Sequence, residues 1–337
     1  MEFGSGLREG GKVACLQFNP SLGEVKENMR RAEELLEGSG EFRGGGIDWL
    51  ILPEMAFSGY NFPSLQHIQP FLEPTASGPS TKWAIRTANR YNCHVTVGYP
   101  ETVKFKLLAA RHSTLLHNSF ARSHLPVPKR YNSTVTVNPQ GEVIYHYRKC
   151  FLYYTDESWA DEGPGIPISL PSVTTPENPF RSVDLGTPLG QIHHGICMDI
   201  NPYKFIDYTK YEFATAALSA KAPTIVLSMA WLTNLSPDEL ALDPNKPDMN
   251  TFAYWMDRFW PVNRGMEEVT MIFANRCGVE DNARYAGSST VVRVRQGDIR
   301  VFGQLGKAEE GVLVVDTKQV GYSASLVAPR SYSSLRY

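Results

Sequence analysis

The sequence predicts an α/β protein in which a β-sheet is covered by helices. Short apolar runs typical of buried strands alternate, over the first hundred residues, with segments whose apolar residues keep helical spacing. Of the 337 residues, 42% are hydrophobic and 20% are charged, an ordinary globular composition that can bury a large core. The length would allow roughly two domains, but α/β enzymes of this size are often one unit. We therefore expect a single domain.

Helix and strand signals alternate in the first half of the chain. Apolar positions at helical spacing begin at Val25 and stop before Gly38, and Ser80 stands where the N-cap of a second amphipathic helix is expected. The turn at residues 138–141 separates two alternating runs, as in a hairpin. We predict strands at residues 12–18, 48–54, 94–99, 133–137 and 142–152, with helices at 25–37 and 80–91 between the first three.

The second half continues this alternation with longer connections. Residues 164–188 are a Pro-rich connection, and residues 237–247 are polar. The Trp and Tyr residues of 252–264 are interpreted as the packing face of a core helix and not as a cofactor site. We predict strands at 189–197, 224–228, 270–274, 290–295 and 312–315, a helix at 211–220, and a polar, loosely ordered tail at 323–337.

Three of these strands end in chemically reactive side chains. Glu54 closes one apolar run, Lys149 follows an alternating run, and Cys197 ends a strand just before a turn and a new helix. Taken alone, a strand-end Glu or Lys is a solvated surface charge and a lone Cys is a small buried hydrophobe. An acid, an amine and a thiol at three strand ends together favour a cysteine nucleophile with a base and a cation beside it.

The contexts of these three residues resemble a known family. Leu52-Pro53-Glu54, Arg148-Lys149 and Gly195-Ile196-Cys197-Met198-Asp199 match the three signatures of the nitrilase (carbon–nitrogen hydrolase) superfamily. This resemblance implies a four-layer α-β-β-α sandwich, formed as one domain over residues 11–322. It also implies that Glu54, Lys149 and Cys197 are the catalytic triad.

Further stretches are similar to a fungal branch of this superfamily that deamidates N-terminal Asn and Gln in the Arg/N-degron pathway. They include Met229-Ala230-Trp231-Leu232, Pro247-Asp248-Met249-Asn250 and Ala274-Asn275-Arg276-Cys277-Gly278. The resemblance implies a hydrolase that converts the side-chain amide of N-terminal Asn and Gln of polypeptides to Asp and Glu, with release of ammonia and without a cofactor. Members of the superfamily commonly pair, so a homodimer stays open.

The chemistry of amide hydrolysis requires these residue types. An amide carbon is a poor electrophile and ammonia a poor leaving group, so the reaction needs a strong nucleophile, support for the oxyanion and a proton for the nitrogen. We expect Cys197 to form a thioester while Glu54 moves the proton and then activates water. Lys149 would favour the thiolate and, with the backbone N–H of Met198, hold the oxyanion.

The α-ammonium of such a substrate needs a negative partner. The segment after Lys149 is rich in acidic residues around Trp159, although a solvent-facing loop explains such a composition equally well. The superfamily often uses a second glutamate after the lysine, and Asp156-Glu157 offers no clear match to it. We predict that the substrate-binding residues are Asp156, Glu157, Asp161, Glu162 and Met198, with Asp199, Glu280 and Asp281 as second choices for the ammonium.

Other activities remain open at this point. Small-molecule ω-amidases and carbamoyl-amide hydrolases of the same superfamily need no peptide after the first residue, and an inactive binder of N-terminal residues would keep the fold. A Cys-His pair is disfavoured, because His194 points to the strand face opposite Cys197 and His193 lies about 13 Å along the strand at ~3.3 Å per residue. No His or Cys cluster has the spacing of a metal site.

Composition also limits the partners that we expect. The formal charge of −2 offers no global attraction to nucleic acid or to an anionic membrane. Five cysteines, with no C-x-x-C pair, argue against a disulfide framework and a zinc site. Reduced thiols predict a reducing compartment, the cytoplasm, with a mitochondrial or nuclear pool left open. Residues 1–10 resemble residues left by cloning and are left out of the fold prediction.

Residues 103–130 interrupt the strand pattern. They contain no Asp or Glu, six Lys or Arg and three of the eight His. We interpret them as an insertion, because the flanking strands are joined more directly in relatives of the superfamily. A basic run of this kind could contact RNA or an acidic protein, could be a solvated loop, or could be translated intron sequence.

Overall fold

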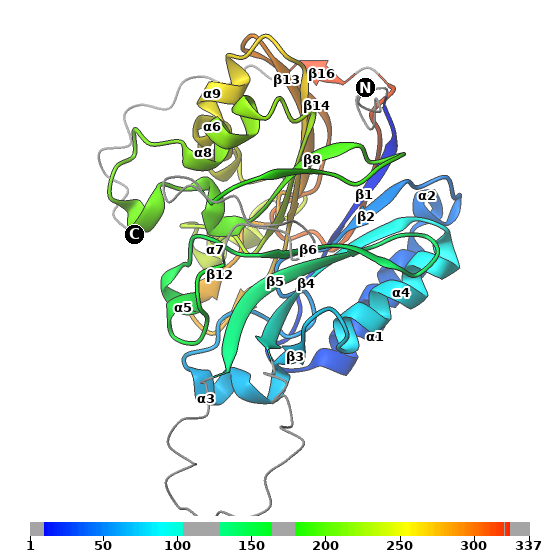
Figure 1. The fold of residues 1–337 in the computed structure, drawn as a ribbon, viewed down its shortest axis with the longest axis vertical. Coiled ribbons are helices and arrows are strands. Elements are labelled where there is room, and N and C mark those ends of the chain that lie inside the picture. Colours follow the sequence, from blue (N-terminus) through cyan, green and yellow to red (C-terminus); the bar gives the residue numbers. More distant parts are fainter. Residues whose placement is uncertain (1–9, 104–127, 164–178, 320, 324–337) are drawn as a thin grey trace, which may run out of the picture.

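The computed structural model describes residues 10–103, 128–163, 179–319 and 321–323. Within these residues the chain forms two seven-stranded sheets that face each other, with helices on their outer sides (Figure 1). The strand order is β15-β1-β2-β4-β5-β6 in the first sheet, where β3 also pairs with β4. The second sheet has the order β16-β14-β13-β10-β9-β8-β7, and β11 and β12 form a separate ribbon.

The bounds of the strands and helices are as follows. The first sheet consists of β1 (Lys12–Gln17), β2 (Trp49–Ile51), β3 (Glu73–Pro74), β4 (His94–Val103), β5 (Lys129–Val137), β6 (Val143–Arg148) and β15 (Gly311–Asp316). The second consists of β7 (Ser182–Asp184), β8 (Gln191–Ile196), β9 (Thr224–Met229), β10 (Val269–Asn275), β13 (Thr290–Arg295), β14 (Asp298–Gln304) and β16 (Tyr322–Ser323), and the ribbon of β11 (Val279–Glu280) and β12 (Ala283–Arg284). The α-helices are α1 (Val25–Gly38), α2 (Gly40–Arg43), α3 (Leu65–Ile68), α4 (Pro79–Tyr91), α5 (Tyr154–Glu157), α6 (Glu212–Ser219), α7 (Pro237–Ala241), α8 (Met249–Arg258) and α9 (Trp260–Asn263). The short 3-10 helices are η2 (Gln69–Phe71), η4 (Cys197–Ile200) and η5 (Tyr203–Phe205).

The strand directions bring the ends of several strands to one edge. In the first sheet β1, β2 and β4 are parallel, and β5 is antiparallel both to β4 and to β6. Strand β6 therefore runs in the same direction as β2. In the second sheet β8, β9 and β10 are also parallel to one another. Residues that directly follow β2 and β6, or β8 and β9, thus emerge together, as ligand-binding residues of parallel sheets commonly do.

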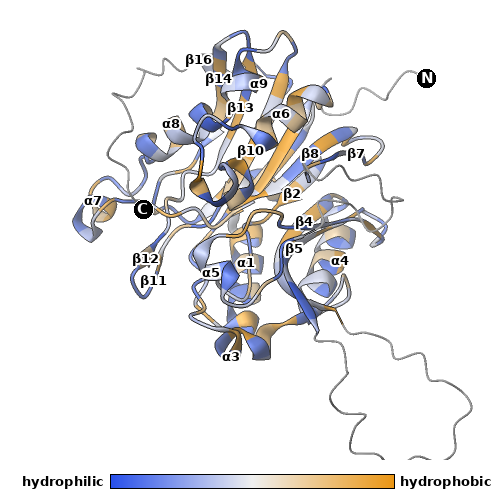
Figure 2. Ribbon diagram, turned by 60° about the vertical axis from the view of Figure 1, so that its left-hand side comes forward, coloured by the Kyte–Doolittle hydropathy of each residue, from blue (hydrophilic) through white to orange (hydrophobic). Residues whose placement is uncertain are grey.

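The outer face of the first sheet packs against α1 and α4. Alternate residues of its strands, such as Leu50 and Val95, share an apolar cluster with Ala32 and Leu36 of α1 and with Trp83 of α4. Residues next to these in the strands point the other way, toward the second sheet. The strands at the centre of the molecule are mostly hydrophobic, while the helices carry hydrophilic residues as well (Figure 2).

The space between the sheets and the outer face of the second sheet form one apolar cluster. Ile51 of β2 and Tyr147 of β6 contribute to it from the first sheet, and Ile225 of β9 from the second. Phe213 of α6 and Trp255 of α8 cover the outer face, where the Trp255 ring stacks on Phe273 at 5.0 Å. The predicted four-layer α-β-β-α sandwich is confirmed.

Two expectations about helices are wrong in detail. The second helix does not begin with Ser80 as its cap, because Gly78 occupies the N-cap position and α4 starts at Pro79. Ser80 instead donates its backbone N–H and its hydroxyl to Glu73, at 2.9 and 2.6 Å, so its hydrogen bonds join the first turn of α4 to β3. The expected helix at 252–264 is divided between α8 and α9, where Pro261 begins a new helical turn.

Some elements were not expected at all. The polar segment 237–247 contains α7, which Ser236 caps by accepting the backbone N–H of Glu239. Strand β14 follows β13 through a tight turn at Gln296-Gly297, where both residues have positive φ. It was not predicted, because its mixture of charged and apolar residues does not give a clear strand pattern. Among the described residues, no helix is long and apolar enough to cross a membrane.

The proposed insertion at 103–130 is shorter at both ends in the structure. Val103 pairs with Lys129, and Thr102 with Arg130, so these residues extend the β4–β5 ladder. Residues 104–127 lie outside the described part of the chain, as does most of the tail at 323–337. The nature of the inserted segment therefore stays a prediction.

Candidate active site

Glu54 is carried to the buried centre of the molecule by the turn that follows β2. The turn lies against β4, with the backbone N–H of Leu52 donating to Thr96 O at 2.9 Å and that of Ala56 to Gly98 O at 3.1 Å. A Cβ atom on Gly98 would lie 2.5 Å from the backbone nitrogen of Met55, so this close approach requires glycine. The side chain of Glu54 is 1% exposed.

Lys149 directly follows β6 and is completely buried. Its backbone N–H donates to Asn132 O at 2.8 Å, which continues the β5–β6 pairing by one residue. The Nζ atom donates to Glu54 Oε1 at 2.7 Å and to Asp156 Oδ2 at 2.6 Å. One ammonium group therefore joins two carboxylates that are far apart in the sequence.

Two further donors complete this charged cluster, which consists of Glu54, Lys149, Asp156 and Asn132. The amide of Asn132 donates to Glu54 Oε1 at 2.6 Å and to Asp156 Oδ1 at 2.9 Å. The backbone N–H of Ala230, just after β9, donates to Glu54 Oε2 at 2.8 Å. Both carboxylates are thus satisfied on each oxygen, as buried charges must be if they are to persist in a folded protein.

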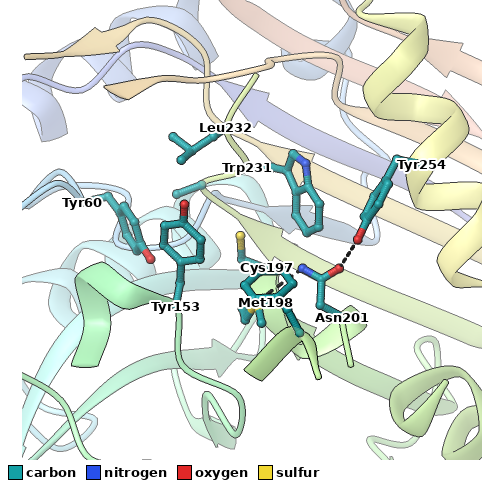
Figure 3. A pocket seen from close by; sticks show the side chains of 10 residues that line it. Tyr60, Tyr153, Cys197, Met198, Asn201, Trp231, Leu232 and Tyr254 are labelled. Atoms are coloured by element: carbon teal, nitrogen blue, oxygen red, sulfur yellow. Dashed lines mark hydrogen bonds between the residues drawn. The ribbon is translucent and has the colours of Figure 1, made fainter. Parts of the chain in front are cut away.

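Cys197 stands at the end of β8, where the chain turns sharply into η4. Its φ of 42° lies in the left-handed region, an unfavourable conformation for a residue other than glycine and one that is often found at functional sites. Gly195, two residues earlier, lets α6 approach the strand, because a Cβ atom there would lie 2.5 Å from the Phe213 ring. The thiol is 7% exposed and faces the pocket (Figure 3).

Asp199 ties the turn at Cys197 to the segment after Lys149. Its Oδ1 accepts the backbone N–H groups of Cys150 and Phe151, at 3.0 and 2.9 Å. Its Oδ2 accepts the N–H of Ile196 and the hydroxyl of Tyr147, both at 2.8 Å. Because the acceptor is fully buried, the two strand ends that carry the amine and the thiol are held in one arrangement.

The electrostatic environment favours a neutral Cys197 thiol and a charged Lys149. Burial raises the pKa of the Cys197 thiol well above its ordinary value, the Glu54 carboxylate raises it further, and Lys149 lowers it. Burial also raises the pKa of Glu54, against the lowering effect of Lys149. For Lys149, burial would lower the pKa, but the carboxylates of Asp156 and Glu54 outweigh it and the net shift is upward. A thiol and a lysine ammonium are therefore the resting forms.

The pocket above Cys197 is lined mainly by aromatic side chains. The residues that line it are Tyr60, Tyr153, Cys197, Met198, Asn201, Phe205, Ala230, Trp231, Leu232 and Tyr254. The Tyr254 hydroxyl donates to Asn201 Oδ1 at 2.6 Å, and the Tyr60 hydroxyl to Asp156 Oδ2 at 3.0 Å (Figure 3 shows the first of these).

The acidic residues that we assigned to the α-ammonium do not line this pocket. Asp156 is fully buried, and its oxygens accept hydrogen bonds from Lys149, Asn132, Tyr60 and the Tyr153 backbone. Glu157 is exposed on α5. Neither residue is therefore part of the pocket lining, and Asp156 accepts a hydrogen bond from Lys149. Their role toward a substrate stays a prediction.

The remaining acidic candidates are also placed elsewhere. Asp161 pairs with Lys129 at 2.9 Å, and Glu162 accepts from the Tyr203 hydroxyl at 2.8 Å. Glu280 accepts the backbone N–H groups of Tyr60 and Asn61 and pairs with Arg276, while Asp281 is exposed. The carboxylate of Asp199 accepts the four hydrogen bonds described above. The physical reason is common to all but the exposed ones: each carboxylate already has donors from the protein.

The two histidines before Cys197 contribute to packing. His194 lies between the Tyr145 and Tyr147 rings, and its Nε2 is 3.0 Å from Thr134 Oγ1 across the sheet interface. His193 contacts the Phe213 ring on the other side. Burial lowers the pKa of both to about 3, so both are neutral at physiological pH. Neither lines the pocket. In the described part of the chain, no group of three or more His, Cys, Asp or Glu residues could hold a metal ion.

Several residues of the charged cluster and of the pocket had no predicted role. Asn132 directly precedes the strand predicted at 133–137, and Tyr60 follows the Glu54 motif without a pattern of its own. Asn201, Trp231 and Tyr254 lie in or beside stretches that resemble the superfamily branch, which was a signal of importance without a role. Tyr254 was expected to pack in the core, yet it both packs against Trp231 at 5.6 Å and lines the pocket.

Comparison with known proteins agrees with this fold and geometry. Residues 12–201 match the family model described as Carbon-nitrogen hydrolase. A protein N-terminal amidase of Schizosaccharomyces pombe is 34% identical over 317 residues, which cover 90% of this chain and 98% of the relative. The chain belongs to the carbon–nitrogen hydrolase family.

Other relatives place the chain within that family. A protein N-terminal amidase of Saccharomyces cerevisiae is 29% identical over 235 residues, which cover 67% of this chain and 46% of the relative. A crystal structure of an N-terminal amidase superposes with a TM-score of 0.70 at 21% identity, covering 91% of this chain and 97% of the other. That likeness shows the same fold.

Proposed function

We propose that this protein removes the side-chain amide of N-terminal Asn and Gln residues of polypeptides, giving Asp and Glu with release of ammonia. The observation that carries the proposal is the position of Cys197, whose thiol opens into an aromatic pocket while Glu54 and Lys149 are close enough to shift its pKa. Two relatives, 34% and 29% identical to this chain, are named protein N-terminal amidases, and solved structures of an N-terminal amidase contain Asn-Glu-Ala and Gln-Val peptides.

The reaction begins with transfer of the Cys197 proton to Glu54. The thiolate attacks the amide carbon, and the tetrahedral oxyanion is stabilised by the Lys149 ammonium and by the backbone N–H of Met198. Glu54 then gives its proton to the leaving nitrogen, so that ammonia departs and a thioester remains. The raised pKa makes Glu54 a stronger base than an ordinary carboxylate, which favours its accepting the thiol proton before it returns a proton to the leaving nitrogen.

Hydrolysis of the thioester uses the same groups again. Glu54 removes a proton from water, the hydroxide equivalent attacks the thioester carbon, and collapse of the second oxyanion releases the acid as the proton returns to the Cys197 sulfur. One amide and one water thus yield one carboxylic acid and one ammonia. Asp156 and Asn132 stay bonded to Lys149 and Glu54 throughout, which keeps the cation in place for both oxyanions.

The cysteine thiols support a reducing compartment such as the cytoplasm. All five cysteines of the sequence lie in the described residues, where each is buried and none is joined in a disulfide. The mechanism also needs Cys197 as a reduced thiol, because an oxidised sulfur is not a nucleophile.

Ammonia release from short synthetic peptides tests the proposal. We expect turnover of peptides that begin with Asn or Gln, little turnover of their N-acetylated copies or of free glutamine, and none with Cys197→Ala. Cys93→Ala is the matched control, since Cys93 is equally buried but lies in the outer apolar cluster beside α4. Turnover of free glutamine at the same rate would replace the proposal with a small-molecule ω-amidase. If a folded protein released ammonia from none of these substrates, the proposal would be contradicted.

A further inference from the structure

Exposed apolar side chains gather beside the mouth of the pocket. Tyr154 is 59% exposed, Ile206 78% and Tyr208 44%, which is unusual for such large side chains. Together with Phe205 they form what we call the mouth ledge, defined as Tyr154, Phe205, Ile206 and Tyr208. Clusters of this kind on a folded protein commonly mark a binding surface.

The mouth ledge is continuous with the pocket through Phe205. This half-buried side chain lines the pocket, and its ring centroid is 6.0 Å from that of Tyr154 and 6.2 Å from that of Tyr208. Tyr153, another lining residue, lies 5.1 Å from Tyr154. An unbroken row of rings therefore leads from the space above Cys197 to the protein surface.

The backbone holds this row in place. Lys204 and Phe205 have φ values of 52° and 56°, so the chain makes a sharp turn in the left-handed region just where Phe205 enters the pocket. The turn is closed by the Phe205 N–H, which donates to Pro202 O at 3.0 Å. Nearby, the N–H of Tyr153 donates to the buried Asp156, which anchors the first turn of α5 and the Tyr154 ring above it.

The length of a substrate places its second residue at the mouth ledge. If the amide carbon of the first side chain is at Cys197, the short Asn or Gln side chain leaves the first Cα within the pocket. Consecutive Cα atoms are about 3.8 Å apart, so the second residue emerges at the mouth. The half-buried lining residues there are Tyr153, Phe205 and Leu232, and they lie at the border between the pocket and the exposed rings.

We propose that the mouth ledge is a subsite for an apolar side chain at the second position of the substrate. This inference rests on the proposed function and adds a sequence preference to it. An apolar second side chain loses contact with water when it lies on these rings, whereas glycine gains nothing. Since the rings are fixed by the turn and by α5, little ordering is needed on binding.

Peptides that begin with Asn-Leu and Asn-Gly, otherwise identical, test the subsite. We expect the wild-type protein to favour Asn-Leu in kcat/KM by about tenfold, as partial burial of one leucine side chain allows. In Tyr154→Ser and, separately, Tyr208→Ser the ratio should fall toward one. The matched control is Leu242→Ser, a 68% exposed leucine outside the pocket lining, which should keep the wild-type ratio.

The outcomes separate this inference from the proposed function. Equal turnover of the two peptides by the wild-type protein would overturn the subsite while the deamidation of N-terminal Asn stands. If neither peptide is turned over, both proposals fail together. If Tyr154→Ser instead lowers the molecular mass measured by light scattering, a second copy of the chain covers the mouth ledge and the subsite is also overturned.

Discussion

The charged cluster and the aromatic pocket differ in how their side chains are held. In the cluster of Glu54, Lys149, Asp156 and Asn132, both carboxylates accept at least one hydrogen bond on each oxygen, and all four residues are shielded from solvent. In the pocket, rings such as Trp231 and Phe205 are held mainly by packing. The pocket also makes polar contacts at a few points, such as the bond from Tyr254 to Asn201.

This difference teaches how the two regions divide their contribution to activity. A fully bonded charged cluster keeps its geometry and its protonation, so changes there should act on the chemical step and on stability together. Packed rings can be shortened without leaving a buried charge, so changes there should act on substrate affinity. Four predictions follow, from the largest effect to the smallest. Three compare the two regions, and one concerns Asp199, which ties the segment after Lys149 to the turn at Cys197.

Lys149→Met should have the largest effect. It removes the cation between Glu54 and Asp156 and leaves two carboxylates buried beside each other. We expect turnover to fall on the order of a thousandfold and the free energy of unfolding to fall by about 3 kcal/mol or more. Ammonia release and denaturant unfolding measure the two effects.

The matched control for that variant is Lys246→Met. Lys246 pairs with Asp243 at 2.9 Å on the surface, where its side chain is 72% exposed. A pair in water contributes little, so both readouts should stay at their wild-type values. If the two variants behaved alike, the buried cluster would not be the part of the molecule on which the chemistry depends.

Asp199→Asn should change how stability depends on pH. Burial raises the pKa of Asp199 from 3.8 to about 6, although the N–H groups of Phe151 and Ile196 oppose the shift. Between these two values the folded state holds a proton that the unfolded state has lost, so raising the pH favours unfolding. We expect the wild type to lose about 2 kcal/mol relative to the variant from pH 4 to pH 7.

Denaturant unfolding at several pH values measures this difference. Asp281→Asn is the control, because Asp281 is exposed and its φ of 49° is one that Asn adopts easily. If the free energy of unfolding depended on pH in the same way for wild type and Asp199→Asn, Asp199 would not take up the proton. The upward direction of its pKa shift would then be wrong.

Trp231→Ala should act on affinity. The indole is one wall of the pocket, and its removal exposes the substrate side chain to water without leaving a charge unpaired. We expect KM for an N-terminal Gln peptide to rise roughly tenfold while kcat changes much less. A fall in kcat with unchanged KM, measured in the same kinetic series, would mean that the aromatic wall positions the reacting atoms.

Tyr254→Phe should have the smallest effect. It keeps the ring and removes only the hydroxyl that donates to Asn201. Loss of one neutral hydrogen bond should weaken binding of an N-terminal Asn peptide by about fivefold. Calorimetric titration of a protein that also carries Cys197→Ala would measure this without turnover. If the loss of affinity were as large as for Trp231→Ala, the Tyr254 hydroxyl would contact the substrate directly.

The fold could be predicted to a large extent because local patterns report it. The alternation of apolar runs and amphipathic segments placed most long strands and helices, and the resemblance supplied the four layers. Short or mixed elements escaped, such as β14 with its charged residues and α7 within a polar segment. Their stability comes from pairing and capping partners in other parts of the chain, which a local pattern does not contain.

The sequence by itself determined which residue types stand at the ends of β2, β6 and β8, and hence that an acid, an amine and a thiol would meet. Only the tertiary structure decided which groups the Asp156 carboxylate contacts. Its spacing from Lys149 suggested a substrate contact, but burial gave its carboxylate to Lys149, Asn132 and Tyr60. The physical reason is that a buried charge takes whatever donors the packing brings to it, and residues such as Asn132 and Tyr60 come from distant segments whose meeting no local spacing encodes.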